Sequence, residues 1–133
     1  MAFVNVKNLK KVVGGVRVLE QRALKATQGA VRTEGELLMT ASQKIVPVKE
    51  GFLKNSKFVE DRTARGIVRI LIGYSAIYAL AVHEIPPPPA QSEGGRSATH
   101  KNGQWKFLET PLKERTPGYA ERVAKRIRKR LLK

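Results

Sequence analysis

The sequence has no cysteine, and this absence excludes a disulfide framework, a thiol nucleophile and a zinc site built on cysteine. It has only two histidines, His83 and His100, whereas a zinc site takes three or four protein ligands at fixed distances. No apolar run approaches the ~18 residues of a membrane-spanning helix. At the N-terminus, lysines follow the few apolar residues, which is the reverse of a secretory signal. We therefore expect a protein made in the cytoplasm, without a metal site, a disulfide or a membrane span.

Motifs for catalysis and cofactor binding are also missing. His83 and Glu84 come nearest to a general acid–base pair, but no nucleophile or oxyanion element accompanies them. The glycine pairs at 14–15 and 94–95 fit neither the dinucleotide-binding glycine motif nor a phosphate-binding loop. We predict that the protein is not an enzyme and carries no cofactor.

Acidic residues are scarce, since 11 Asp and Glu stand against 26 Lys and Arg, for a formal net charge of +15. The excess is spread over the chain, because residues 1–66 and 67–133 carry 13 Lys and Arg each. Such a charge repels itself, and a polyanion such as nucleic acid would relieve the repulsion. Contact with nucleic acid or with an acidic protein face is one interpretation, and a solvated basic surface is the other.

The length of 133 residues indicates a single domain, residues 1–133, whose first element is a long amphipathic helix at 8–45. Gly14 and Gly15 are poor helix residues and mark either the true start of this helix or a kink. Pro47 ends it, because the residue before a proline is pushed out of the helical region. Its stripe of apolar and small side chains, a core or subunit-packing face, is Val12, Val16, Leu19, Ala23, Ala26, Ala30, Leu37, Ala41 and Ile45.

Residues 52–84 are expected to form the sheet region. Residues 67–72 are the strongest strand signal, because they are rich in β-branched side chains and bounded by Gly66 and Gly73. With residues 54–59 they predict an antiparallel pair joined by residues 60–66. Residues 76–83 fit either a strand or a short helix, and periodicity alone does not decide between them.

The last region, residues 105–133, is expected to consist of a strand and a basic C-terminal helix. The candidate strand itself covers residues 104–108. Thr110 as a cap and Pro111 in the first turn begin the helix, and residues 116–118, Thr-Pro-Gly, kink or restart it. The predicted fold class is therefore α+β, with a long N-terminal helix and a C-terminal helix packed on a small antiparallel β-sheet. The expected buried residues are Leu37, Ala41, Ile70, Ile72, Tyr78, Phe107, Leu108, Val123 and Ile127.

Cations crowd the C-terminal helix, where a single acid, Glu121, accompanies seven Lys and Arg between residues 120 and 133. Favourable interaction with the helix dipole explains two or three of them. The rest form either a solvated face or a face that contacts phosphates or acids without reading bases. The residues we expect to contact DNA or a protein partner are Arg122, Arg126, Lys129, Arg130 and Lys133.

Residues 85–104 form a long loop with four consecutive prolines, followed mainly by small and polar residues. A loop of this length inside a small domain is unusual and is commonly functional. The prolines favour a polyproline II spacer, so we expect an extended loop or arm that reaches a neighbouring subunit. Its candidate contact residues are Pro86, Pro87, Pro88, Pro89, Arg96, His100 and Lys101.

Three segments, in this order and spacing, resemble a family of tailed-bacteriophage proteins of the head–tail junction, the neck, tail-completion or minor tail component proteins. Residues 45–56, IVPVKEGFLKNS, are similar to the family's Pro-x-x-x-Gly-x-Leu-(Arg/Lys)-x-Ser segment. Residues 73–84, GYSAIYALAVHE, are similar to its Tyr-Ala-x-x-Val-(His)-Glu segment. Residues 103–112, GQWKFLETPL, are similar to its (Lys/Pro)-Phe-Leu-x-x-Pro-(Ala/Leu) segment before a C-terminal helix. The resemblance covers residues 35–130, and the proline-rich insertion and the Thr116-Pro117-Gly118 break depart from it.

The resemblance implies a structural subunit of a virion, assembled in the host cytoplasm. Such a subunit would belong to a sixfold or twelvefold homo-oligomeric ring that joins the capsid portal to the tail. It would contact neighbouring connector and tail proteins and, without sequence preference, the phage double-stranded DNA. The alternative is a free, sequence-independent nucleic-acid-binding protein. A free binder is expected to carry aromatic stacking platforms or a recognised reading motif, whereas Trp105 is the only tryptophan here.

Overall fold

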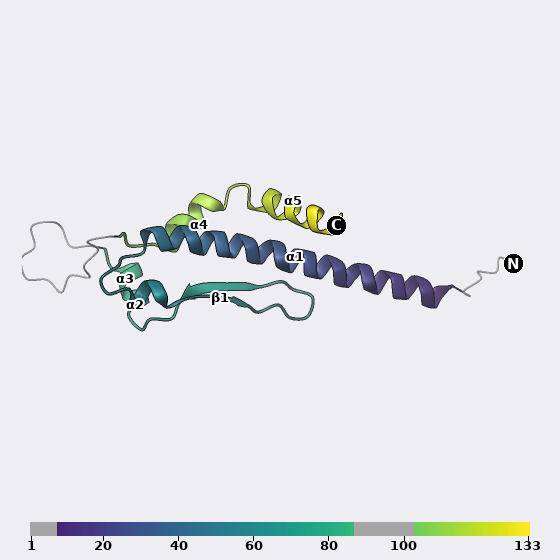
Figure 1. Ribbon diagram of the computed structural model, residues 1–133, viewed down its shortest axis with the longest axis horizontal. Helices are drawn as coiled ribbons and strands as arrows, with labels where there is room; N and C mark the ends of the chain where they lie inside the picture. The colour runs from purple at the N-terminus through teal and green to yellow at the C-terminus, as the bar shows by residue number, and fades with distance from the viewer. Residues whose placement is uncertain (1–7, 87–102) are drawn as a thin grey trace, which may run out of the picture.

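A computed structural model of the chain describes residues 8–86 and 103–133. One long helix runs the length of the molecule, with two helices along one side of it and a β-hairpin along the other (Figure 1). In chain order the elements are α1 (Leu9–Ile45), α2 (Phe52–Asn55), β1 (Lys57–Asp61), β2 (Ile70–Tyr74), α3 (Ala79–Glu84), α4 (Glu109–Arg115) and α5 (Tyr119–Leu131). The α+β class, with both terminal helices and a small antiparallel sheet, is confirmed.

Helix α1 continues unbroken through Gly14 and Gly15, so these residues mark neither its start nor an interruption. A Cβ added at either glycine would meet no atom within 4 Å, which fits a helix surface without a neighbour. The helix ends at Ile45, because Val46 has the extended conformation (φ −62°, ψ 133°) that a residue before proline prefers. Its 37 residues span roughly 55 Å at about 1.5 Å per residue.

The hairpin pairs β1 and β2 antiparallel, from Lys57 opposite Tyr74 to Asp61 opposite Ile70. Both strands lie about three residues later than the sequence analysis placed them, a shift with two causes. Helix α2 takes up Lys54 and Asn55, which were assigned to the first strand. Residues 67–69 instead help to close the hairpin, where Ala64 pairs with Ile67 around two residues of positive φ.

Two further assignments change in the second half. Residues 104–108 form no strand: they make turns, with Lys106 at φ 56°, and lead directly into α4 at Glu109. The backbone N–H of Lys106 donates to the carbonyl of His83, and that of Gln104 to Ile45, so this segment bonds to helix ends instead of a strand. For residues 76–83 the helical alternative is the one observed, as α3. The restart at Thr116-Pro117-Gly118 occurs, with Gly118 at φ 71°.

The core lies at the C-terminal end of α1. Its buried members are Val46, Leu53, Ala79 and Phe107, and partly buried apolar residues pack around them. The Phe107 ring meets the rings of Tyr74 and His83 edge-on, at centroid distances of 5.2 and 4.9 Å. Every residue of this cluster belongs to one of the three segments at 45–56, 73–84 and 103–112. Those segments are therefore the parts of the chain that build the core.

The predicted core was too extensive. Of its nine residues Phe107 is fully buried, whereas Tyr78 and Leu37 are 47% and 38% exposed. The other six are partly buried. The sheet has only two strands, and α1 meets α5 through small side chains, so few large apolar side chains of the described residues are enclosed. The N-terminal part of the predicted stripe on α1, from Val12 to Leu19, is exposed.

Candidate nucleic-acid interface

Small residues allow α5 to lie directly on the middle of α1. Ala26 and Ala30 are 6% and 0% exposed there. Gly29 lies beside them, and a Cβ at that position would come within 2.5 Å of the Arg130 guanidinium. Arg130 Nη2 instead donates to the Gly29 carbonyl at 3.2 Å. The alanine and glycine spacing of α1 thus determines how closely the basic helix approaches.

A buried glutamate holds the two C-terminal helices to α1. Glu34, 3% exposed, accepts from Arg115 Nη2 and Arg122 Nε at 3.1 Å each, both on Oε2. Arg126 Nη2 lies 3.1 Å from its other oxygen, Oε1. Arg122 also donates from Nη1 to the carbonyl of Pro117, which fixes the break between α4 and α5. We call Glu34 with Arg115, Arg122 and Arg126 the arginine clamp.

The clamp keeps Glu34 ionised. Burial alone would raise the pKa of its carboxyl, but the hydrogen bonds from Arg122, Arg115 and Arg126 together outweigh burial, and the pKa is lowered. Each arginine of the clamp keeps about a third of its side chain exposed. Three cations against one carboxylate leave a local excess of positive charge on this side of the molecule.

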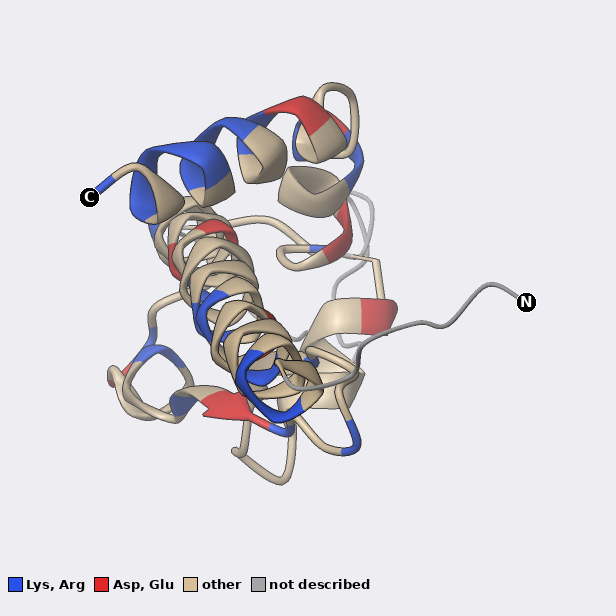
Figure 2. Ribbon diagram, turned by 90° about the vertical axis from the view of Figure 1, so that its right-hand side faces the viewer, with Lys and Arg blue, Asp and Glu red and all other residues tan. Residues whose placement is uncertain are grey.

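Beside the clamp, α1 and α5 enclose an open groove of about 670 Å³ that we call the basic groove. Its cations come from both helices: Arg22 and Lys25 from α1, and Arg126, Lys129, Arg130 and Lys133 from the C-terminal end. None of the described residues lining it is acidic. Lysines and arginines follow α5 and the adjoining part of α1 in the view along the long helix (Figure 2). Two helices thus direct their cations into one concave surface.

Four of the five residues predicted on the C-terminal helix line the basic groove, namely Arg126, Lys129, Arg130 and Lys133. Arg122, the fifth, belongs to the arginine clamp and does not line it. Arg126 and Arg130 have intramolecular partners, whereas Lys129 and Lys133 bond to no other described residue. Of the predicted arm, Pro86 is described and exposed. Pro87, Pro88, Pro89, Arg96, His100 and Lys101 lie outside the described residues.

Sequence reasoning missed Arg22 and Lys25. Their signal is their position on α1, immediately before the small residues Ala26, Gly29 and Ala30 on which α5 packs. It also missed Glu34 and Arg115. An acid four residues after Ala30, in line with the small residues, indicates a buried carboxylate that needs cationic partners.

A second charged cluster ties α3 to α4. Lys106 Nζ contacts Glu84 and also Glu109 Oε2, at 3.0 Å for the latter. Hydrogen bonds from Lys113 and Lys106 lower the pKa of Glu109 to about 2. His83 Nδ1 lies 2.7 Å from Glu84 Oε1. Glu84 and Glu109 each pair with a lysine, and Glu84 also contacts the His83 ring. The cluster therefore connects α3 to α4 and leaves neither carboxylate unpaired.

Two other kinds of feature are not found among the described residues. No three His, Asp or Glu side chains come together there in a way that could hold a metal ion. None of the helices in the described part of the chain is long and apolar enough to cross a membrane.

The basic groove is suited to binding a polyanion. Its cations come from both helices, its apolar lining residues are Ala26 and Leu131, and none of its described lining residues is aromatic, so it lacks a platform for stacking bases. Such a surface contacts phosphates but does not identify bases. Comparisons with protein-family models, curated proteins and solved structures found no match to this chain.

Proposed function

We propose that the protein is a non-enzymatic structural subunit of a bacteriophage neck or tail-completion ring, and that its basic groove contacts double-stranded DNA without reading sequence. The observation that carries the DNA contact is the groove itself, which gathers six cations, two from α1 and four from α5 and the residues after it, with no acid among its described lining residues. Duplex DNA carries one charge per ~1.7 Å of axis, so distributed Lys and Arg can hold it at any sequence.

The character of the groove also suits a conduit. DNA that passes through a ring must slide, and exposed lysines make solvated, sequence-tolerant contacts with phosphates. Lys25, Lys129 and Lys133 are exposed and bond to no other described residue, so all three are available to a phosphate.

The ring and virion part of the proposal rests on the resemblance of three segments to head–tail junction proteins. Support comes from where those segments lie, since they pack on one another and supply the whole hydrophobic cluster around Phe107. If the three segments form the core that such a family shares, they are expected to pack against one another although they lie far apart in the sequence. In the assembled virion, the neighbours would be further copies, connector proteins and tail proteins.

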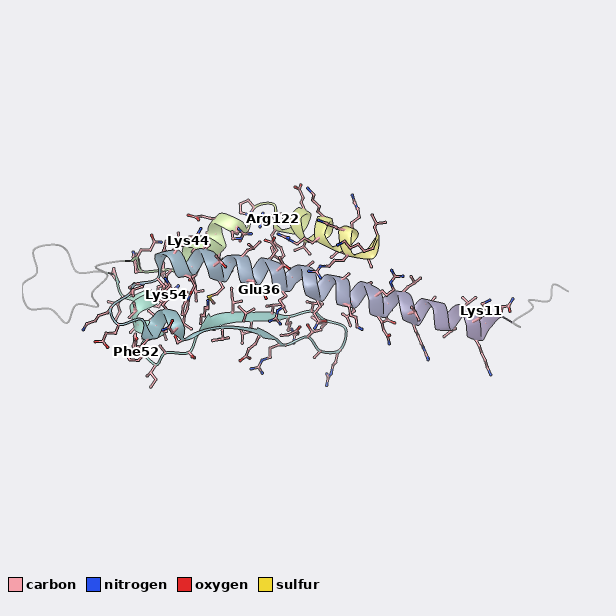
Figure 3. The ribbon with its side chains drawn as sticks, viewed as in Figure 1. Lys11, Glu36, Lys44, Phe52, Lys54 and Arg122 are labelled. Carbon is pink, nitrogen blue, oxygen red and sulfur yellow. The ribbon has the colours of Figure 1, made fainter. Side chains whose placement is uncertain are left out.

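Two charge-matched variants test the DNA contact. Lys25→Gln/Lys129→Gln/Lys133→Gln removes three groove cations without touching the arginine clamp. The control Lys44→Gln/Lys49→Gln/Lys54→Gln removes three cations at the C-terminal end of α1 and in the following segment, none of which lines the basic groove. Lys44 and Lys54 lie toward the end of the molecule away from α5 (Figure 3). Fluorescence anisotropy with random-sequence duplexes at several salt concentrations gives the affinity and its salt dependence.

We expect sequence-independent binding that weakens steeply with salt. The groove variant should lose affinity, and the slope of log K against log salt should become shallower by about 0.9 for each cation that met a phosphate. The control should stay close to the wild type. Equal losses of affinity in the two variants would mean that DNA binding depends only on the net charge of the protein, and the groove would then not be the contact.

Light scattering and electron microscopy of the purified protein, and cryo-electron microscopy of virions, test the ring. A closed oligomer located between capsid and tail is expected. A protein that binds DNA yet stays monomeric at all concentrations, and is absent from virions, would instead be the free nucleic-acid-binding protein considered above.

A further inference from the structure

The N-terminal part of α1 carries an apolar stripe that nothing in the described chain covers. Val12, Val16 and Leu19 are 59%, 57% and 63% exposed, and they lie on one helical face at spacings of four and three. The same face continues to Ala26 and Ala30, where α5 covers it. Figure 1 shows this part of α1 extending beyond α5 and beyond the hairpin. We call residues 9–19 the projecting segment.

A second uncovered apolar surface lies at the other end of the molecule. An open groove of about 730 Å³, here called the apolar groove, runs between β2 on one side and α4 and α5 on the other. Ile70 and Ile72 form one wall, and Leu112 and Tyr119 the other. Gly35 on α1 lies between the walls, where a Cβ would come within 3.2 Å of Ile70 Cγ2.

These two surfaces cannot meet within one chain. Both belong to the single helix α1, the projecting segment to its start and the apolar groove to its second half around Gly35. From Val16 to Gly35 the helix rises roughly 30 Å at about 1.5 Å per residue. A contact between them therefore requires a second copy.

Charge orients that contact but does not drive it. Lys10, Lys11 and Arg17 on the projecting segment bond to no other described residue. Glu114 on α4 and Glu121 on α5, the helices of the groove's outer wall, are likewise unpaired in the described chain. These two acids lie among a larger number of cations on α4 and α5, so they orient the approach of the segment, and burial of apolar surface drives it.

We propose that the projecting segment of one copy docks in the apolar groove of the next, with Val12, Val16 and Leu19 against Ile70, Ile72 and Leu112. The contact joins two different surfaces, so it repeats from copy to copy and generates a ring if the rotation closes, or a filament if it does not. The inference deepens the ring proposal and rests on it for closure into a ring.

Complementary variants test the docking. Val12→Gln/Val16→Gln/Leu19→Gln makes the segment polar with a good helix former and no change of charge. Leu112→Lys/Ala120→Lys places cations in the groove at two exposed positions. Ile77→Lys/Leu80→Lys is the control, because these residues are 102% and 72% exposed and lie outside both surfaces. Light scattering measures the mass of each variant and of the mixture.

We expect the wild type and the control to form higher oligomers and each of the two variants to be monomeric. Mixing the two variants should give a one-to-one dimer and nothing larger, because one intact segment and one intact groove remain. A groove variant that assembles like the wild type would overturn the contact, as would a mixture that stays monomeric. If all variants still form the wild-type ring, this contact is wrong while the ring proposal stands. If the wild type itself stays monomeric, both fail.

Because the chain has no cysteine, disulfide trapping gives an independent measurement that does not depend on disruptive substitutions. Val16→Cys and Leu112→Cys, mixed under oxidising conditions, should form a disulfide-linked heterodimer, since a bridge needs Cα atoms within about 7 Å. Val16→Cys mixed with Leu80→Cys should not. Equal cross-linking of both mixtures would reject the proposed pairing.

Discussion

Glu34 occupies a position on α1 where the preceding Ala26 and Ala30 would lead one to expect another small residue. It is as buried as they are, and three arginines from α4 and α5 converge on its two oxygens. A carboxylate in this position is tolerated only because it is paired and hydrogen-bonded. At the scale of single residues, the placement of the basic C-terminal helix therefore depends on one acid.

Replacing Glu34 by Gln should lower the free energy of unfolding by about 1–3 kcal/mol, because three partly buried guanidinium groups lose their charge partner. Glu36→Gln is the matched control on the same helix. Its ion pair with Arg32 is about half exposed, and such a pair contributes at most about 1 kcal/mol. Urea denaturation at pH 7 measures both, and equal effects would contradict the structural role of the clamp.

The same pair of variants has a defined pH dependence. The pKa of Glu34 is lowered in the folded protein from an ordinary value of 4.5, so its contribution to stability is complete above that value. It is lost as the pH falls through the folded pKa. Denaturation at decreasing pH should therefore bring wild type and Glu34→Gln together, because a protonated glutamate carries no charge. A difference that stayed constant down to pH 2 would point to a packing effect instead.

At the scale of elements, the two glycines near the start of α1 reduce the stability of the projecting segment. Gly14→Ala/Gly15→Ala should raise helicity there, because both positions are open and alanine is favoured over glycine by about 0.5–1 kcal/mol each in a helix. Hydrogen exchange of amides 12–19, with circular dichroism, measures the change. Gly29→Ala is the control and should gain less, since its Cβ would displace the Arg130 guanidinium from its bond to the Gly29 carbonyl.

The elements themselves were predicted well where local chemistry is strong and less well where tertiary contacts decide. Pro47 and Gly118 determine helix boundaries through backbone geometry, and both boundaries were predicted. The strand expected at 104–108 failed because Phe107 inserts into the core as part of a turn, where its apolar side chain is buried without a ladder partner. The strand shift in the hairpin has a similar origin, since the turn at Arg65 and Gly66 sets the register.

At the scale of the whole molecule, the loop between α3 and α4 should be dispensable for folding. Its two flanks are held to the core by the bonds from Lys106 N to His83 O and from Gln104 N to Ile45 O, each 2.9 Å. Replacing residues 87–102 with a short Gly-Ser linker should leave the melting temperature within a few degrees of the wild type. Calorimetry tests this point.

The same replacement tests the predicted arm. If residues 87–102 reach an adjacent subunit, the variant should fold but assemble poorly, as seen by light scattering and by particle yield. Normal particles from a folded variant would remove that role from the loop. A variant that fails to fold would instead show that the loop belongs to the core.

The sequence predicted the cations that α5 contributes to the candidate site but not those that α1 contributes. The difference arises from how the whole molecule packs. The cations of α5 are dense enough in sequence to be recognised without a structure. Arg22 and Lys25 are ordinary surface residues until α5 packs beside them, and that packing depends on Glu34, Gly29 and the alanines of α1. Long-range packing therefore creates the groove, and no local window of sequence contains it.

The arginine clamp also has a consequence for the order of events during synthesis. Its partners are separated by 81, 88 and 92 residues, and α5 follows the other helices and the hairpin in the order of synthesis. Until α5 is made, the nascent chain has a helix with an unpaired carboxylate and a bare alanine face, which is a surface suited to chaperones. The groove cannot form before α5 has been made. If the groove binds nucleic acid as proposed, this affinity arises only after α5 has packed on α1, which would protect the unfinished subunit from binding the abundant RNA around it.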